Sequence, residues 1–596
     1  MHTNINRTLF IIVALGLIQG LMLLLGQQLV HRAILSGSDL AWRVPWYAVA
    51  FGVPTALQLM VNGLGDRRVW GFGLGLLGVL ALTGVYTGLV AYPGPDASNS
   101  VVVTPYVLTI LCGWYVSLPF VQTYLKTGRL RPIYADLFDF AWNNLITLMI
   151  AALFTGIFWG LLALWAALFK VIGIGFFDRV FYHVYFSLPV SSIVFAFALY
   201  VGRANVQAVA TVRRIILAIF KGLLPLLAVI IVLFLIALPW MGLKPLWATG
   251  KATALMLTLQ VFLVIFLNAV FQDGNNSPPY PAWLRAALRV ALILLPVYAL
   301  LCAYALYLRI DQHGWSTDRF WAVLLTLIIG LYVFGYALAA LRRSAVWMRG
   351  IAPVNIAIAA LVVMLSILVN SPALDARRLS AHSQVARLLA GSVVAARFDY
   401  DYLRFDLGKA GKTALERLRD IQGHPEADNI RAGAVAALAK TSQWGPQIVT
   451  VETVAELRTH LVLYPRGAVF EEGFLRHFLT HKGDWRLRGC FGVNQYCPVL
   501  ALDINNDGRV EYLVFSIDND FEHAVAVFSH PQQWRQVGWL NRLSTSADES
   551  QELLEQTLAR GDYAAVQSPW RDVRVGRFRH QFYEELSFPP NFAFQR

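Results

Sequence analysis

Charged residues are scarce in this chain. Of its 596 residues only 14% are Asp, Glu, Lys or Arg, whereas soluble domains contain about a quarter of such residues. Because 57% of the residues are hydrophobic, the composition indicates a protein that lies in a lipid bilayer. The net charge of +13 does not point to nucleic acid, since Lys and Arg fall mostly between hydrophobic runs and no basic-aromatic module is present.

Catalytic motifs are also missing. The chain contains no Gly-x-Ser-x-Gly, no His-Glu-x-x-His and no kinase motif, so no catalytic residue is named and enzymatic activity is left open. The stretch from Asp406 to Thr413 imitates a phosphate-binding loop. Such a loop has a glycine five positions before Gly411, where this chain has Asp406. We therefore expect no nucleotide partner.

Long apolar runs, in contrast, are abundant. A helix needs about 20 apolar residues to cross the hydrocarbon of a bilayer. The chain has about eleven suitable stretches, at 8–26, 44–63, 69–91, 102–124, 144–168, 185–202, 215–240, 252–272, 286–308, 320–341 and 351–370. The sequence therefore predicts a polytopic α-helical membrane domain over residues 1–370.

The loops between these stretches predict the orientation of the chain. Cytoplasmic loops of membrane proteins are enriched in Lys and Arg. If the N-terminus is inside, the inner loops contain more of these residues than the outer ones, for example Lys126, Arg129 and Arg131 in one inner loop. With an odd number of spans the C-terminal part is then extracytoplasmic. We expect a bacterial inner-membrane protein with a periplasmic C-terminal domain.

The C-terminal part divides into a helical stalk region at 371–445 and an α+β domain at 446–596. Strand signals lie at 497–503, 510–516 and 523–529, and a helical stretch lies near 546–560. His477 and His481 are four residues apart on an expected helix, a spacing that suits zinc. Because no third ligand accompanies them, we interpret both as structural residues.

The four cysteines form two pairs with different surroundings. Cys112 and Cys302 lie inside apolar runs, whereas Cys490 and Cys497 are separated by a short spacer that contains a glycine. A disulfide between Cys490 and Cys497 is expected in an oxidising compartment. Two unpaired thiols or a fragment of a metal site are the alternatives.

Oxygen-bearing side chains alternate in the stretch Asp503-Ile-Asn505-Asn-Asp507-Gly508-Arg-Val-Glu511. Carboxylate and amide oxygens at this spacing are the ligands that calcium prefers. We expect Asp503, Asn505, Asp507 and Glu511 to bind calcium. The alternative is an Asn-Asp-Gly hairpin turn that needs no metal.

Polar residues also occur at the borders of the predicted spans. Asp136, Asp139 and Asn143 are three and four positions apart and therefore share one helical face. This face is either a site for a cation, a proton or a lipid headgroup, or an acidic first turn that complements the helix dipole, which is the favoured interpretation. Arg285 and Arg289 are candidate contacts for lipid phosphates.

Several amides lie within the spans themselves. They are expected to make hydrogen bonds between helices before they are considered as ligands. These residues are Gln58, Asn62, Gln260, Asn268 and Asn355.

Four segments resemble an uncharacterised bacterial family, domain of unknown function 4153. They are Tyr134-Ala-Asp-Leu-Phe-Asp-Phe-Ala-Trp-Asn-Asn144, the stretch from Leu164 to Gly173, the connection from Asp273 to Arg285, and Phe398-Asp-Tyr-Asp-Tyr-Leu-Arg-Phe-Asp406. The resemblance covers roughly residues 1–440 and implies a multi-span inner-membrane protein of Gram-negative bacteria. It implies no activity and no catalytic residues.

The stretch 503–511 is similar to a single calcium loop of the integrin and VCBS type, Asp-x-Asp-x-Asp-Gly-x-x-Asp. Asn505 stands where that loop has its second Asp, and Glu511 stands where it has its last one. Both side chains provide oxygen, but their reach differs, so the affinity for calcium would change.

Three functional classes fit these features. The preferred hypothesis is an envelope scaffold or homeostasis factor that contacts membrane lipids and has a calcium-binding periplasmic head for a protein partner. A transporter or lipid flippase, and a lipid- or glycan-modifying enzyme, are the alternatives. A hydrated central cavity would favour transport, a lateral groove with convergent acids would favour lipid chemistry, and a packed bundle would favour a scaffold.

Overall fold

The computed structural model describes residues 2–31, 40–91, 99–241, 252–274, 280–342, 348, 350–440, 451, 453–481, 487, 490–491, 496–518, 521–530, 533–540, 551–565, 573–575 and 578–580. The chain folds as two units, Met1–Gln443 and Trp444–Arg596. The segment predicted as a stalk belongs to the first unit. We call the second unit the head.

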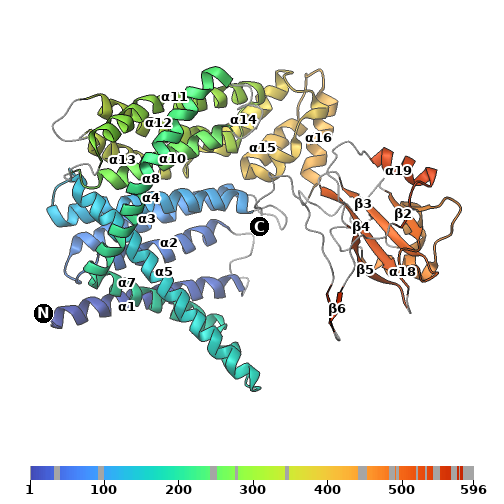
Figure 1. Ribbon diagram of the computed structural model, residues 1–596, viewed down its shortest axis with the longest axis horizontal. Coiled ribbons are helices and arrows are strands. Elements are labelled where there is room, and N and C mark those ends of the chain that lie inside the picture. The colour runs from blue at the N-terminus through green and yellow to red at the C-terminus, as the bar shows by residue number, and fades with distance from the viewer. Residues whose placement is uncertain are drawn as a thin grey trace. The chain divides into compact units, whose positions relative to one another are not determined.

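The first unit is built from long helices that lie side by side (Figure 1). They are α1 (His2–His31), α2 (Leu40–Met60), α3 (Arg67–Val90), α4 (Asn99–Thr127), α5 (Tyr134–Val171), α7 (Val184–Ala204), α8 (Val206–Met241), α10 (Ala252–Phe271), α11 (Ala282–His313), α12 (Thr317–Leu341) and α13 (Ile351–Leu368). The short α6 (Phe176–Phe181) follows α5. Each predicted apolar stretch overlaps one long helix.

Among the described residues, 10 helices are long and apolar enough to cross a membrane. The long helix that is not among them is α2, which contains Arg43, Pro45, Pro54 and Gln58. It nevertheless runs antiparallel to α1, since Trp46 Nε1 donates to Met22 O (2.9 Å) and Thr8 Oγ1 donates to Asn62 O (2.9 Å). The geometry of α2 is therefore that of its spanning neighbours.

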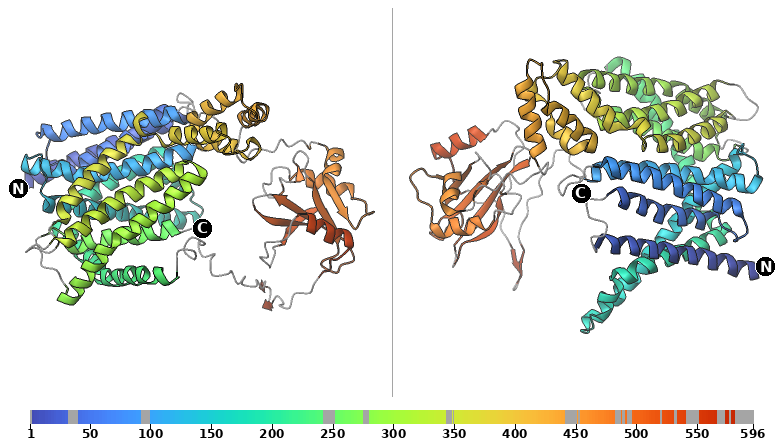
Figure 2. Two further views of the ribbon diagram at one scale, coloured as in Figure 1. Left: turned by 90° about the horizontal axis from the view of Figure 1, so that it is seen from above. Right: turned by 180° about the vertical axis from the view of Figure 1, so that it is seen from behind.

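The helix bundle has two distinct ends. At one end Thr8 of α1 meets Asn62 after α2, and Lys126 of α4 pairs with Asp136 of α5 at 2.6 Å. We call this the N-terminal end. The opposite end carries residues 371–440, which we call the cap (Figures 1 and 2).

The cap, the region predicted as a helical stalk, is a compact group of helices. It contains α14 (Ala376–Leu389), α15 (Gly408–Arg419) and α16 (Ala427–Ala439). Their buried side chains form a separate apolar core. The backbone N–H groups of Trp315 and Thr317, at the start of α12, donate to Ser383 Oγ (3.0 Å) and Tyr402 OH (2.9 Å). The cap is thereby attached to the bundle by hydrogen bonds.

Glycines allow the first helices to approach closely. A Cβ atom at Gly84 of α3 would lie 2.6 Å from Pro45 Cα, and one at Gly16 of α1 would lie 2.6 Å from Ala196 Cβ of α7. Small residues commonly permit such contacts between membrane helices. The packing of α1, α2, α3 and α7 therefore depends on these positions.

The head combines a mixed sheet with short helices. The strands are β1 (Leu461–Tyr464), β2 (Cys497–Leu502), β3 (Glu511–Asp518), β4 (Phe521–Ser529) and β5 (Arg535–Leu540), in that spatial order. β1 is parallel to β2 and the remaining neighbours are antiparallel. The helices are α17 (Val454–His460), α18 (Glu472–Leu479) and α19 (Gln551–Arg560), and β6 (Val573–Val575) pairs with β7 (Phe578–His580).

Aromatic side chains form the core between α18 and the sheet. Phe474 and Phe478 of α18 are fully buried, and both rings contact Phe528 of β4 at centroid distances of 5.5 and 5.4 Å. The predicted α+β arrangement of strands and helices is confirmed. The first part of the helix expected near 546–560 lies outside the described residues.

Candidate functional site

A polar cavity of about 490 Å³ opens at the N-terminal end of the bundle. It lies among α2, α3, α4, α5, α7 and α8. Its polar lining consists of Asn62, Asp66, Gln122, Lys126, Asn143, Asn144, Thr147 and Arg203. Such a concentration of polar groups beside apolar helices identifies this cavity as a candidate binding site.

Arg203, in the last turn of α7, is the central cation of this cavity. Its Nη1 donates to Gln58 O (2.5 Å) and Val61 O (2.9 Å), and its Nη2 donates to Asn62 Oδ1 (2.7 Å). These acceptors belong to the C-terminal end of α2, where a positive charge complements the helix dipole. Within the described part of the chain, no carboxylate forms an ion pair with Arg203.

The predicted acidic face of α5 also lies at this end. Asp136 pairs with Lys126 at 2.6 Å, and Asp139 pairs with Arg213 of α8 at 2.7 Å. Asn143 accepts a weaker hydrogen bond from Arg213 (3.4 Å) and lines the cavity. Because basic side chains balance both carboxylates, this face retains little negative charge for a further cation.

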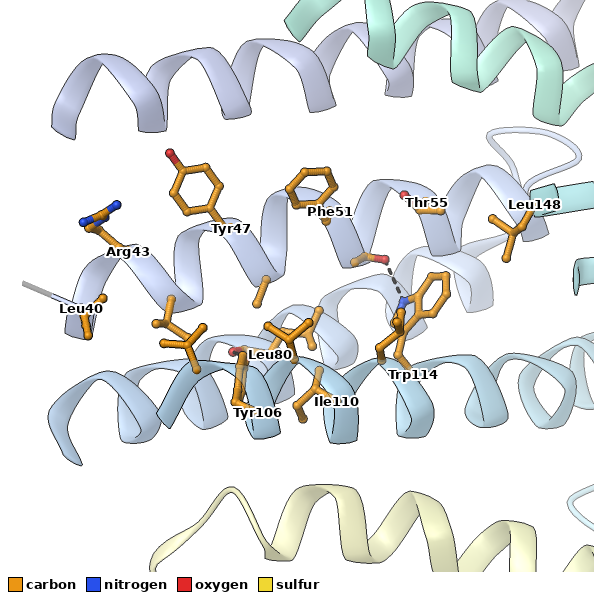
Figure 3. A pocket seen from close by; sticks show the side chains of 16 residues that line it. Leu40, Arg43, Tyr47, Phe51, Thr55, Leu80, Tyr106, Ile110, Trp114 and Leu148 are labelled. Carbon is orange, nitrogen blue, oxygen red and sulfur yellow. Dashed lines mark hydrogen bonds between the residues drawn. The ribbon is translucent and has the colours of Figure 1, made fainter. Parts of the chain in front are cut away.

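A second, apolar cavity of about 640 Å³ lies nearer the cap end (Figure 3). We call it the groove. It is lined by α2, α3 and α4, with Leu148 of α5 at one end. Arg43 and Leu40 lie at the other end, and Trp114 donates through Nε1 to Gly52 O (3.0 Å) across the groove.

The groove and the polar cavity follow one another along the same helices. On α4, Trp114 lines the groove and Gln122 lines the polar cavity. Leu118 lies between them on α4 and is fully buried. On α5 the neighbouring residues Leu148 and Thr147 face the groove and the polar cavity respectively.

A closed hydrogen-bond network joins α5 to the later helices. Asn355 Nδ2 donates to Tyr134 OH (2.7 Å) and Asn268 Oδ1 (2.5 Å), while Tyr336 OH donates to Asn355 Oδ1 (2.5 Å). Asn268 Nδ2 completes the network by donating to Tyr336 OH (2.7 Å). Asn268 and Asn355 thus make the expected bonds between helices, and their tyrosine partners were not predicted.

The other predicted amides behave less uniformly. Gln58 Nε2 donates to Gln19 Oε1 of α1 (3.3 Å). Gln260 Nε2 donates to Met256 O within its own helix (3.1 Å) and lies 3.7 Å from Cys302 Sγ of α11. The contribution of Gln260 to helix association is therefore the weaker of the two.

The four predicted calcium ligands lie in the loop between β2 and β3 or at its border, and three of them are joined by side-chain hydrogen bonds. Asn505 Nδ2 donates to Asp507 Oδ2 and Glu511 Oε1, both at 3.1 Å. Asp503 Oδ2 accepts from Gly508 N (2.9 Å), and Gly508 has a φ of +81°. The amide of Asn505 thus lies between the carboxylates of Asp507 and Glu511.

Two observations bear on whether this loop fits calcium. Glu511 is only 2% exposed, and its carboxylate accepts from Ile504 N, Asn505 Nδ2 and Ser529 Oγ, all neutral donors. A buried carboxylate without a cation favours a metal. Against this, the described residues contain no group of three or more His, Cys, Asp or Glu side chains arranged to hold a metal. Asn505 would have to turn its oxygen inward.

The disulfide between Cys490 and Cys497 is confirmed, with an S–S distance of 2.07 Å. His477 and His481 lie with ring centroids 4.9 Å apart, and both pack against Phe528. Burial and the neighbouring His481 lower the pKa of His477. This packing agrees with structural histidines.

Arg285 and Arg289 lie in the first turns of α11. Arg289 is exposed, whereas Arg285 is half-buried. Because α12 starts at the cap, α11 begins at the opposite, N-terminal end. Neither arginine is among the residues that line the polar cavity.

The architecture is that of a polytopic helical membrane protein with a small C-terminal sheet domain. A family model described as "Domain of unknown function (DUF4153)" matches residues 47–418, and the chain belongs to this family. No curated protein and no solved structure matches the chain.

Proposed function

We propose that this protein is a lipid-binding scaffold of the bacterial inner membrane with a calcium-binding periplasmic head. The observation that carries the proposal is the apolar groove among α2, α3 and α4. Along α2 the lining runs from Leu40 to Thr55, about 22 Å at a rise of about 1.5 Å per residue. This length is more than one leaflet of a hydrocarbon core about 30 Å thick, so the groove is long enough for an acyl chain and the start of its headgroup.

The ends of the groove indicate which part of a lipid it would hold. Apolar side chains, among them Phe51, Leu80 and Ile110, line its length. The cation Arg43 lies at one end of the groove (Figure 3), and a cation at such a position attracts a lipid phosphate. We infer that an acyl chain of a phospholipid occupies the groove with its headgroup near Arg43.

This proposal is tested by filling the groove. Ala48→Trp places a large ring among the lining residues, whereas Leu74→Trp makes the same substitution on α3 at a residue that is 71% exposed. Native mass spectrometry of the purified full-length protein should show bound phospholipid for the wild type and for Leu74→Trp. Ala48→Trp should lose most of it. Equal lipid occupancy in all three proteins would contradict the proposal.

The periplasmic placement of the head is part of the proposal. Basic residues such as Arg67, Arg129 and Arg214 gather near the N-terminal end, and positive residues favour the cytoplasmic side. The disulfide supports an oxidising compartment for the head. A reporter that is active only in the cytoplasm should therefore stay dark when fused after Arg596. A bright fusion would place the head inside.

Calcium binding by the loop 503–511 is tested on the full-length protein. A ligand that binds only the folded form adds about 2.7 kcal/mol at a hundredfold excess over its dissociation constant. The head should therefore melt at a higher temperature with calcium than with a chelator. Asp507→Asn and Glu511→Gln should remove this difference, and Asp562→Asn, which changes an exposed acid elsewhere in the head, should retain it.

A lipid flippase or transporter remains the second candidate. It is favoured by the serial arrangement of the groove and the polar cavity along α4, with Leu118 between them. A fluorescent phospholipid should then cross the bilayer of vesicles that contain the protein, and Leu118→Trp should stop it. Absence of translocation by the wild type would leave the scaffold as the better function.

A further inference from the structure

We propose that the polar cavity at the N-terminal end binds a phosphate group, and that Arg203 and Lys126 are its principal contacts. The ligand is a phosphate ester of a lipid headgroup or free inorganic phosphate, which share this chemistry. The proposal concerns a second site and does not require the groove to hold a lipid.

The charge balance of the cavity favours an anion. Asp66 is paired with Arg68 at 3.2 Å, and it also caps α3 by accepting from Arg68 N. Asp136 and Asp139 are paired with Lys126 and Arg213. Arg203 also lines the cavity, and among the described residues its hydrogen-bond partners are neutral carbonyl and amide oxygens. The local sum of charges is therefore positive.

The donors that remain in the cavity suit phosphate oxygens, which only accept hydrogen bonds. A guanidinium has five N–H groups, and the bonds described above for Arg203 occupy three of them. The Lys126 ammonium has three, and one is directed at Asp136. Both side chains line the same cavity and keep donors for a further acceptor.

Two amides hold the floor of the cavity in place. Gln122 Nε2 donates to Asn144 Oδ1 (3.1 Å), and Asn144 Nδ2 donates back to Gln122 Oε1 (2.8 Å). Both residues are buried, and together they join α4 to α5. This pair fixes the spacing between Lys126 on α4 and Asn143 on α5, so the cavity is built before any ligand enters.

The position of the cavity gives access from the membrane surface. Its lining includes the ends of α2 and α4 and the starts of α3 and α8. The Lys126 side chain is 59% exposed. A headgroup at the membrane boundary could therefore reach Arg203 without crossing the bilayer.

The test uses full-length protein in detergent with two probes, dihexanoyl phosphatidic acid and inorganic phosphate. Binding is measured by native mass spectrometry and by the shift in melting temperature. Lys126→Gln should weaken binding about tenfold, the loss expected for one charge-assisted hydrogen bond. Arg203→Gln should weaken it at least as much, and Arg203→Lys should restore part of it. The control Arg214→Gln, at an exposed cation of α8, should bind as the wild type does.

Each outcome of this test is decisive. Binding of the lipid probe alone assigns the site to a headgroup, and tighter binding of inorganic phosphate assigns it to free phosphate. Equal binding shows that the phosphate group itself is recognised. No binding of either probe, or equal loss in Lys126→Gln and Arg214→Gln, overturns the proposal. If Arg203→Gln fails to fold because α2 loses its cap, Lys126→Gln still decides. Ala48→Trp should leave this binding unchanged, which separates the site from the groove.

Discussion

The membrane bundle and the head keep their buried polar groups satisfied in different ways. In the bundle the partners are far apart in the chain, as for Asn355 and Tyr134, which are 221 residues apart. In the head the partners are closer in the chain: the disulfide joins residues 7 apart, Ser529 bonds Glu511 over 18 residues, and Trp534 bonds Glu471 over 63. The bundle therefore depends on correct assembly of many helices, whereas the head depends on contacts within a shorter stretch of chain.

The largest effect is expected from a glycine of the bundle. A side chain at Gly84 would overlap the backbone of Pro45, because its Cβ would lie 2.8 Å from Pro45 N. Gly84→Leu should therefore prevent α2 and α3 from packing and abolish the folded protein in size-exclusion chromatography. Gly78→Leu is the matched control on the same helix, since nothing lies within 4 Å of its Cβ. If both variants fold equally well, close packing at Gly84 is not required.

The next effect concerns the network around Asn355. Asn355→Leu removes three hydrogen bonds, and bonds between membrane helices contribute about 1 kcal/mol each. We expect a loss of about 3 kcal/mol of stability, measured as thermal unfolding in detergent. Thr326→Val is the control, because Thr326 Oγ1 donates to Ala322 O in its own helix. A similar loss in both variants would contradict a special role for the network.

In the head, removal of the disulfide should have a comparable but local effect. Closing a loop of this size restricts the unfolded chain and contributes about 2.5 kcal/mol. Cys490→Ser combined with Cys497→Ser should lower the melting temperature of the head and leave that of the bundle unchanged. Cys112→Ser, which changes a free cysteine of the bundle, is the control. Simultaneous destabilisation of both units by the double variant would show that they unfold together.

The smallest effect is expected at Asp406 in the cap. Burial, Asp399 and Asp318 raise the pKa of this carboxyl above its ordinary value. Ionisation of Asp406 therefore destabilises the folded protein. This loss of stability grows as the pH rises from the pKa of the carboxyl in the unfolded state through its pKa in the folded state. Asp406→Asn should raise the melting temperature slightly at pH 7 and have no effect near pH 3. A destabilising effect at pH 7 would contradict this assignment.

The features that the sequence predicts well are those with a local signal. Long apolar runs identify the helices of the bundle because each helix satisfies its own backbone. The short spacer between Cys490 and Cys497 predicts their disulfide. None of these predictions needs knowledge of distant contacts.

The polar cavity and the groove could not be predicted in this way. Arg203 directly follows the apolar stretch 185–202 and has no distinguishing pattern in the sequence, and its contact with Gln58 joins residues 145 apart. Nothing in the sequence indicates that Tyr134, which precedes a predicted span, and Tyr336, which lies within one, are hydrogen-bond partners of Asn355. Pairing of Asp136 with Lys126 and of Asp139 with Arg213 also depends on how α4, α5 and α8 pack. Such contacts follow from helix packing, which composition does not encode.

The polar character of α2 has a consequence for the biogenesis of this protein. Its Trp46 donates to α1, its Gln58 carbonyl accepts from Arg203 of α7, and its Gly52 carbonyl accepts from Trp114 of α4. When α2 leaves the ribosome, α4 and α7 have not yet been made, because chains are synthesised from the N-terminus. A helix that contains Arg43 and Gln58 enters lipid less readily alone than together with these partners. We expect α2 to reach its final position late, so that the order of synthesis differs from the order of insertion.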